Sequence, residues 1–256
     1  MGIKEGKSFC FFSAKGGVGK TTNLLNLAGI LEQLEKKVLV IDLDLYNGSI
    51  ANALNCDFDK SIYNLVEDLF NNRFKSISNY TTKYDEFIDI LPAPKDPRVA
   101  SQIESKYLND IINRAKSLYD VVLVDLNHSL DENNLTVLSN VDFITFMVTN
   151  DPLDLKNLKS LISIFKKLAI KNFKVMLNNS RDPFKDYYSA YDIRHILNHN
   201  IDYSLSTDLF LQDMEVYNIK GIIVSLDRQF SNIMASDYQA FLTLATDLLG
   251  SGDKNE

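Results

Sequence analysis

The segment Ser13-Ala-Lys-Gly-Gly-Val-Gly-Lys-Thr-Thr22 combines glycines, lysines and hydroxyl groups in the spacing that binds phosphate. Glycine permits close approach and unusual backbone dihedral angles, so four successive N–H groups can surround a β-phosphate: those of Gly16, Gly17, Val18 and Gly19. Lys20 then reaches the β- and γ-phosphates, and the hydroxyl of Thr21 is placed to bind Mg²⁺, with Thr22 completing the nucleotide-binding set. The segment predicts a P-loop nucleotide site, and the alternative is a glycine-rich turn before an ordinary helix.

Three aspartates follow buried apolar runs and can serve the same site. Asp42 ends one run and Asp44 follows it, and their spacing of two places both carboxylates on the same side of an extended chain. Asp125 ends the run 119–125, which is typical of the strand whose acid holds Mg²⁺ through water in P-loop NTPases. Ligands of doubly wound sheets bind outside the carboxyl ends of the strands, so we expect these carboxylates to converge. For Asp44 the alternative is a loop-capping role, because aspartate is common in turns.

The hydrophobic pattern predicts a sheet that brings these strand ends together. Seven short apolar runs are expected to be strands, at residues 8–13, 37–42, 87–91, 120–125, 143–148, 173–177 and 201–205. Helical spacing fills most of the gaps, most clearly at residues 24–34, 151–170 and 238–249. Strands that alternate with helices predict an α/β fold, a doubly wound, mostly parallel sheet with helices on both faces.

Length and composition indicate one soluble domain. The 256 residues are 45% hydrophobic and 24% charged, which excludes disordered, collagen-like and coiled-coil chains. We expect a single domain over residues 1–250 and a polar tail over 251–256. No run approaches the roughly 20 apolar residues of a membrane span, and the first residues lack a signal peptide's apolar core, so the expected location is cytoplasmic. The cysteines Cys10 and Cys56 form no disulfide framework, and the three histidines lack metal-ligand spacing, so we expect reduced thiols and no structural zinc.

The phosphate segment has one departure from the usual P-loop pattern, because Ala14 stands where that pattern begins with glycine and Lys15 follows directly. The pair Lys15 and Lys20 resembles the deviant Walker A motif of the MinD/ParA family of dimeric ATPases, in the SIMIBI class of P-loop NTPases. The resemblance covers nearly the whole chain and implies ATP and Mg²⁺ as ligands and an ATP-dependent homodimer. It implies that Lys15 crosses the dimer interface to the other subunit's phosphates, that Asp42 supports the Mg²⁺ and water region, and that Asp44 orients or activates the attacking water. Taken alone, Lys15 has the alternative of a solvated loop lysine.

The same resemblance implies base-contacting residues in later loops. Asn178 matches an asparagine that contacts adenine, and Asp208 matches the end of a Pro-x-Asp loop in which Ser206 replaces the proline. After Asp125 the family commonly has a proline-containing stretch that this chain lacks. We interpret His128, which lies in that stretch, as a surface residue of the loop, because phosphoryl transfer needs no histidine.

Two segments bear on the subgroup. Asp44-Leu-Tyr-Asn-Gly48, followed by Leu54, and the stretch Asp89-Ile-Leu-Pro-Ala-Pro94 are similar to CpaE/TadZ proteins, which localise Tad-type (type IV) pilus assembly machinery. The resemblance implies protein partners in a polar or pilus/secretion machine, and any recruitment to the inner face of the membrane or to a cell pole is expected to run through those partners. Such proteins commonly carry an N-terminal receiver-like domain, and the P-loop here begins within 16 residues of the start, so that domain is expected to be absent or removed.

Charge and cysteine placement bear on the rival functions. The chain has 27 basic and 34 acidic residues, a net charge of −7, and residues 175–256 carry six basic and twelve acidic residues, so we do not expect nonspecific DNA binding of the ParA partition type. The lysines just upstream of that region are interpreted as a solvated helix end: Lys166, Lys167, Lys171 and Lys174. The last helix lacks lysine and arginine, so direct membrane binding is not expected. Neither cysteine is placed to bridge an iron–sulfur cluster.

Besides a ParA-like DNA partition ATPase, two other interpretations of the chain remain open. One is a regulator of flagellar number, which neighbouring genes would reveal. The other is a nucleotide-binding scaffold that hydrolyses little, since an intact Asp44 permits turnover without setting its rate. Our prediction is an ATPase that is slow without a partner and that positions a cellular machine.

Overall fold

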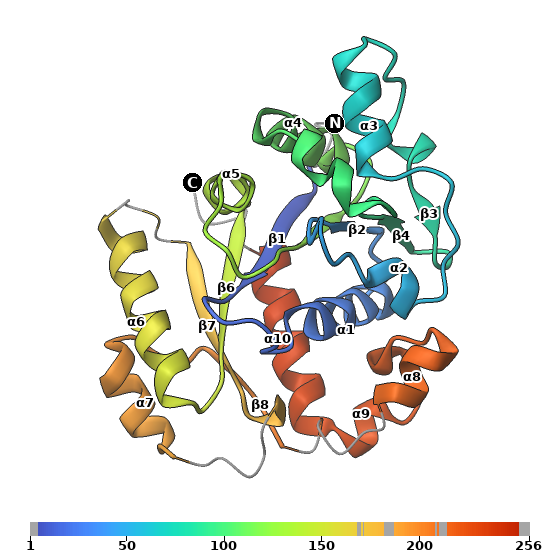
Figure 1. Ribbon diagram of the computed structural model, residues 1–256. Coiled ribbons are helices and arrows are strands. Elements are labelled where there is room, and N and C mark those ends of the chain that lie inside the picture. The colour runs from blue at the N-terminus through green and yellow to red at the C-terminus, as the bar shows by residue number, and fades with distance from the viewer. Residues whose placement is uncertain are drawn as a thin grey trace.

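The computed structural model describes residues 5–167, 170, 172–181, 187–207, 209 and 214–250. These residues form an eight-stranded sheet in the order β3-β4-β2-β5-β1-β6-β7-β8 (Figure 1). The strands are β1 (Lys7–Phe12), β2 (Val38–Asp42), β3 (Thr82–Lys83), β4 (Ile88–Leu91), β5 (Val121–Asp125), β6 (Phe143–Val148), β7 (Phe173–Asn178) and β8 (Tyr203–Leu205). Strands β2 and β5 lie on one side of β1 and β6 to β8 on the other, so the chain reverses its winding direction at the end of β1.

The predicted parallel sheet is confirmed, with one addition at its edge. All seven expected strands are present and pair in parallel. The eighth, β3, pairs antiparallel with β4 through Thr82 and Ile90 and was missed because two residues carry no hydrophobic pattern.

The helices form layers on both faces of the sheet (Figure 1). They are α1 (Lys20–Gln33), α2 (Ile50–Ala53), α3 (Ile62–Phe70), α4 (Ser105–Lys116), α5 (Glu132–Asn140), α6 (Pro152–Lys167), α7 (Ala190–Leu197), α8 (Met214–Lys220), α9 (Phe230–Ile233) and α10 (Ala235–Gly250). Apolar residues of α3 to α7 pack on one face of the sheet, and those of α1 and α10 pack on the other. Within the described ranges, no helix has the length and apolar character needed to cross a bilayer. The expected tail 251–256 lies outside the described residues.

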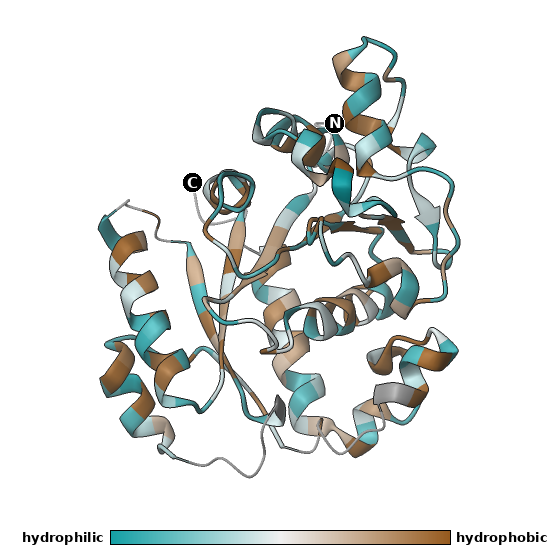
Figure 2. Ribbon diagram, in the orientation of Figure 1, coloured by the Kyte–Doolittle hydropathy of each residue, from teal (hydrophilic) through white to brown (hydrophobic). Residues whose placement is uncertain are grey.

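The side chains of β1 show how the sequence builds two cores from one strand. Phe9 and Phe11 point to the α1 and α10 side, and Cys10 and Phe12 point to the other side. All four are at most 1% exposed, which explains why the strand is a continuous apolar run in the sequence. In Figure 2 the central strands are coloured mainly in tan and brown, and the helices around them carry bands of both teal and brown. The first loop therefore follows a strand that is buried from Ser8 to Phe12.

A pair of carboxyl groups joins the end of α1 to the β3–β4 edge. Burial, followed by a hydrogen bond with Asp85, raises the pKa of Glu32 to about 7. Glu32 Oε2 is buried and receives no donor from the described residues, which favours the protonated, neutral form of this carboxyl group. Folding raises the pKa of Glu32 above the value of about 4.3 that it has in the unfolded chain. The protonated group therefore contributes its full stability to the fold at pH values below about 4.3, and this contribution is lost as the pH rises through about 7.

We therefore expect the wild-type chain to lose stability relative to Glu32→Gln between about pH 5 and pH 8, because the amide of glutamine donates to Asp85 at every pH. Urea unfolding at pH 5, 6, 7 and 8 measures the difference. Glu86→Gln, which neutralises an exposed neighbour, is the control. Parallel stability curves for the wild type and Glu32→Gln would contradict the raised pKa of Glu32.

Candidate nucleotide site

The predicted P-loop connects β1 to α1 at the point where the winding of the sheet reverses. Gly17 has a φ of 72° and Gly19 a φ of 96°, in the left-handed region that favours glycine. Gly19 is the N-cap of α1 and has no side chain to cap it, so the first N–H groups of the helix remain available to an anion. The side chain of Val18 is 1% exposed, so Val18 presents its backbone to the loop. A Cβ atom on Gly16 would lie 3.4 Å from Nδ1 of His128, which is exposed as predicted.

Lys20 is the most buried cation of this loop. Its side chain lies in the first turn of α1 and is 8% exposed, and its Nζ donates to Oγ of Ser13 at 3.3 Å. Burial lowers the pKa of Lys20, and the nearby carboxylates of Asp125, Asp44 and Asp154 oppose that shift. An ammonium group that is shielded from water and bonded to a neutral hydroxyl is well placed to meet an anion.

The candidate metal residues Thr21 and Asp125 are in direct contact. The hydroxyl of Thr21 donates to Oδ2 of Asp125 at 2.7 Å, although 104 positions separate the two residues. Burial raises the pKa of Asp125 to about 6, and the bond from Thr21 and the charge of Lys20 oppose the shift. Mg²⁺ prefers oxygen ligands and usually takes one or two from the protein beside phosphates and water, so this pair fits it. Thr22 follows in the same turn of α1, half-buried.

Asp42 and Asp44 occupy different environments. Asp42 lies beside Asp125 in the sheet register and is 1% exposed. Its two carboxylate oxygens accept the backbone N–H groups of Asp44 and Ile50, each at 3.2 Å, so it fixes the loop after β2. Burial, and next the charge of Asp125, raise the pKa of Asp42 to about 8.

The orientation of Asp44 was attributed to strand alternation, and this attribution was wrong. Strand β2 ends at Asp42, and a turn closed by the bond from Asn47 N to Asp44 O at 3.0 Å positions Asp44 instead. Asp44 is half-buried, and its Oδ1 is buried without a hydrogen-bond partner among the described residues. The charge of Asp44 acts on both Lys20 and Asp125, so the residue lies at the expected site.

Lys15 forms an ion pair that the sequence did not reveal. Its Nζ lies 3.6 Å from Oδ2 of Asp151, and its side chain is 43% exposed. Asp151 accepts the N–H groups of Leu153 and Asp154 at 3.0 Å at the start of α6. These backbone bonds, with a contribution from Lys15, lower the pKa of Asp151. In the single chain the lysine therefore lies at the surface, bound to a neighbouring helix start.

Asn178 contacts the P-loop itself. It is 2% exposed at the end of β7, and its Nδ2 donates to the carbonyl oxygen of Val18 at 2.8 Å. Its Oδ1 accepts the Oγ of Ser180 at 2.6 Å and the N–H of the same residue at 3.1 Å. The residue thus ties β7 to the phosphate loop, and a contact with adenine stays a prediction. Asp208, the other predicted base contact, lies outside the described residues.

The remaining candidate groups stay apart from this site. Cys10 is buried in β1 and Cys56 is half-buried, both as free thiols. No group of three or more histidine, cysteine, aspartate or glutamate side chains in the described part of the chain is arranged to hold a metal ion. The site thus consists of the glycine-rich loop, Lys20, the Thr21–Asp125 pair and the two aspartates after β2.

Comparison with known proteins identifies the family. A family model described as an AAA domain matches residues 6–179. The chromosome-partitioning ATPase Soj of Treponema pallidum (strain Nichols) is 27% identical over 194 residues, which cover 74% of this chain and 73% of that protein. The structure of a ParA family ATPase from Chlorobium tepidum TLS matches with a TM-score of 0.79 at 20% identity, over 94% of this chain and 99% of that one. The structure of the septum site-determining protein MinD with Mg-ADP from Pyrococcus horikoshii OT3 matches with a TM-score of 0.76 at 20% identity. This match covers 97% of this chain and 96% of that one. Because the family match spans well over half of the chain, this protein belongs to that AAA-domain family, the MinD/ParA family of P-loop ATPases.

Proposed function

We propose that this chain is an ATP-dependent switch that binds ATP with Mg²⁺, dimerises around it and hydrolyses it slowly. The observation that carries the proposal is the convergence of Lys20, Thr21 and Asp125 beneath a glycine-rich loop with free N–H groups. The backbone of residues 16–19 binds the phosphates in this proposal, and Lys20 neutralises their charge. The complex of the Pyrococcus MinD with Mg-ADP supports the choice of an adenine nucleotide as ligand.

The metal in this proposal is held by Thr21 directly and by Asp125 through water, with Asp42 as the neighbouring support. When bound, Mg²⁺ neutralises charge on the phosphate oxygens. Asp44 orients the attacking water, because its half-buried carboxylate has an oxygen free of donors from the described residues. Slow turnover is expected while no partner stabilises the switch loops.

The surface around Lys15 supports the dimer. Leu153 follows Asp151, the ion-pair partner of Lys15, and is 68% exposed. Leu130 lies two residues after His128, which faces Gly16, and is 45% exposed. Exposed leucines around a phosphate loop suit a face that a second copy covers. In the dimer, Lys15 leaves Asp151 and contacts the phosphates of the other subunit.

The expected result of adding ATP and Mg²⁺ is conversion of the monomer to a dimer, which multi-angle light scattering measures as a doubled mass. Asp44→Ala should hold the dimer for longer, because hydrolysis is what releases it. ADP is the matched ligand control and should leave a monomer. An unchanged monomer with ATP in both proteins would sink the dimer-switch proposal, and single-turnover hydrolysis would then distinguish a scaffold from an ATPase.

For the cellular role we propose positioning of Tad-type pilus assembly machinery. The two segments that resemble the CpaE/TadZ subgroup contact each other: a Cβ on Gly48 would lie 2.3 Å from Cβ of Ala93. The two segments therefore lie side by side in the fold. Neighbouring genes test the role, since pilus-secretion genes support it, and flagellar genes or a gene for a centromere-binding partner favour the alternatives.

DNA partition is the second candidate, because one helix face is basic. The outer face of α6 carries four exposed lysines that form no salt bridge within the described residues: Lys156, Lys159, Lys166 and Lys167. The Soj relative is named as a chromosome-partitioning ATPase. Against this candidate stands the net charge of −7 for the whole chain.

We expect weak binding to nonspecific duplex DNA at physiological salt, because the acidic surface repels phosphates. A mobility-shift series from about 50 to 200 mM salt, with ATP present, measures it. Tight binding with a steep salt dependence, lost when the four α6 lysines become glutamine, would favour partition over pilus positioning.

A further inference from the structure

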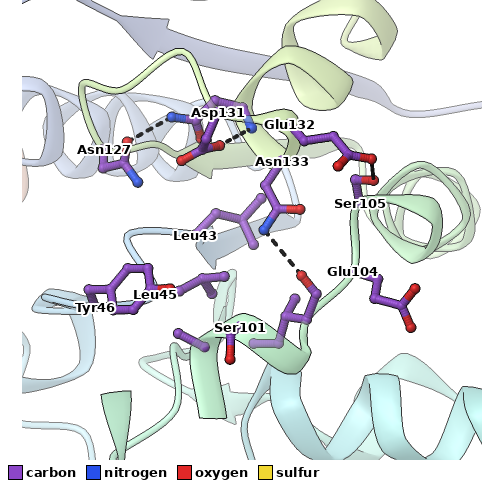
Figure 3. Close-up of a pocket in the computed structure, with 13 residues that line it drawn as sticks. Leu43, Leu45, Tyr46, Ser101, Glu104, Ser105, Asn127, Asp131, Glu132 and Asn133 are labelled. Atoms are coloured by element: carbon purple, nitrogen blue, oxygen red, sulfur yellow. Dashed lines mark hydrogen bonds between the residues drawn. The ribbon is translucent and has the colours of Figure 1, made fainter. Parts of the chain in front are cut away.

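A cavity of about 330 Å³ lies between the segments that follow Asp44 and Asp125 (Figure 3). Three parts of the chain line it: the turn after β2, the segment 100–105 that leads into α4, and the segment 127–134 that leads into and includes the start of α5. The lining contains no P-loop residue, but Leu43 and Leu45 flank Asp44, so the cavity borders the nucleotide site without including the P-loop. Its volume is at the lower end of the roughly 300–1,000 Å³ of ligand pockets, which suits a single long side chain.

The lining combines an apolar floor with an acidic wall. The floor consists of residues that are at most 5% exposed: Leu43, Leu45, Ala100 and Ile103. The wall carries three carboxylates, those of Glu104, Asp131 and Glu132, and no lysine or arginine of the described residues lines the cavity. The ring of Tyr46, which is 59% exposed, adds an aromatic surface. The cavity thus has carboxylates above an apolar base, and no basic side chain of the described residues among its lining.

Two of the carboxylates accept hydrogen bonds from neutral groups. Glu132 Oε1 accepts the hydroxyl of Ser105 at 2.6 Å. Asp131 accepts the N–H of Asn134 at 2.9 Å and the hydroxyl of Ser129 at 2.6 Å. Neither forms a salt bridge with any described residue, whereas Glu104 pairs with Lys106 at 2.8 Å, which does not line the cavity. The charge of Asp131 and Glu132 is therefore available to a cation from outside.

We propose that this cavity binds one arginine or lysine side chain presented by a protein partner. The methylene stem lies on the apolar floor, and the charged head lies against Asp131 and Glu132. The ring of Tyr46 adds a cation–π contact. An anionic ligand would meet three carboxylates, and an apolar side chain would remove their water without replacing it.

The bound side chain would contact the loop that carries Asp44. Leu45 and Tyr46 are the central residues of the turn closed by the bond from Asn47 N to Asp44 O. Leu43 donates its N–H to the carbonyl oxygen of Asp125 at 2.9 Å, so the floor is bonded to β5 as well. A partner docked here holds both segments at once. This contact with a partner is not part of the proposed nucleotide switch, and binding to the cavity can be measured without nucleotide.

The absence of tryptophan from the chain gives a clean reporter. Tyr46→Trp places one tryptophan in the cavity lining, and its emission is followed during titration with N-acetyl-arginine amide. We expect a saturable change that weakens with added salt, because exposed charges are screened. N-acetyl-citrulline amide, which is neutral and of similar shape, should give no saturable change. Equal responses to the two compounds would overturn the proposal.

The wall is tested by adding Asp131→Asn and Glu132→Gln to the reporter protein. Asparagine still caps a helix, and glutamine still accepts from Ser105, so the fold should be kept and circular dichroism checks it. Affinity for N-acetyl-arginine amide should fall by roughly two- to thirtyfold, since two exposed ion pairs are lost and each contributes a factor of roughly 1.4 to 5. Glu35→Gln with Glu86→Gln removes the same charge elsewhere and should leave the affinity unchanged. Unchanged affinity in the wall variant, or an equal loss in the control, would refute the site.

Discussion

Lys20→Ala is expected to weaken ATP binding by the monomer by at least roughly thirtyfold, because truncating a shielded charge partner costs several kcal/mol. Lys15→Ala should leave monomer binding largely intact and abolish ATP-dependent dimerisation. The two lysines are five positions apart, yet one is 8% exposed under the loop and the other has a side chain that is 43% exposed at the surface. That difference in burial is what separates their effects.

A fluorescent ATP analogue titrated at protein concentrations that keep the chain monomeric measures the first effect, and light scattering measures the second. Each variant is the control for the other, because both remove one lysine charge from the same loop. Losses of monomer binding that are equally severe in the two variants would mean that Lys15 acts on its own subunit's nucleotide. The chain would then be a P-loop nucleotide-binding protein without the proposed switch.

Asn178→Asp is expected to lower the free energy of unfolding by at least about 2 kcal/mol, because it replaces a buried donor by a carboxylate that faces acceptors. The Nδ2 group of Asn178 donates to the carbonyl oxygen of Val18 at 2.8 Å, and a carboxylate cannot do so. The new negative charge would also lie beside the phosphate loop, so ATP binding should weaken as well.

Asn179→Asp is the matched control, since it makes the same change one residue later, where the amide contacts Ser204 in an exposed position. Urea unfolding at pH 7 compares the three proteins. If Asn178→Asp unfolds at the same urea concentration as Asn179→Asp, the tether between β7 and the P-loop contributes nothing to the fold.

The order of the elements could be predicted because buried parallel strands are continuous apolar runs, as in 37–42 and 120–125. The phosphate loop could be predicted because its glycines and lysine act locally, within one turn of chain. The edge strand Thr82–Lys83 could not be predicted, because its two residues pair through backbone hydrogen bonds that any sequence can form. The place of Asp44 was inferred from strand alternation, but the strand stops at Asp42 and a turn takes over.

Contacts between segments that are distant in the sequence could not be predicted from the sequence. Asp151 could be recognised only as the start of a helix, and its pairing with Lys15 depends on how α6 packs beside the P-loop. The bond from the amide of Asn178 to the carbonyl oxygen of Val18, 160 positions away, likewise depends on how β7 packs beside the P-loop. The acidic cavity is formed by three segments that are distant in the sequence, and none of them has a sequence pattern that indicates a cavity.

The 104 positions between Thr21 and Asp125 have a consequence for folding kinetics. Within the described sheet, the central strand β1 pairs with β5 and β6, which are synthesised more than a hundred residues later, so closing the sheet requires long-range contacts and is expected to be slow. The nucleotide site is complete only after that closure, so we expect ATP to bind the folded chain much more tightly than the transition state for folding. ATP is therefore expected to slow unfolding while leaving the refolding rate unchanged.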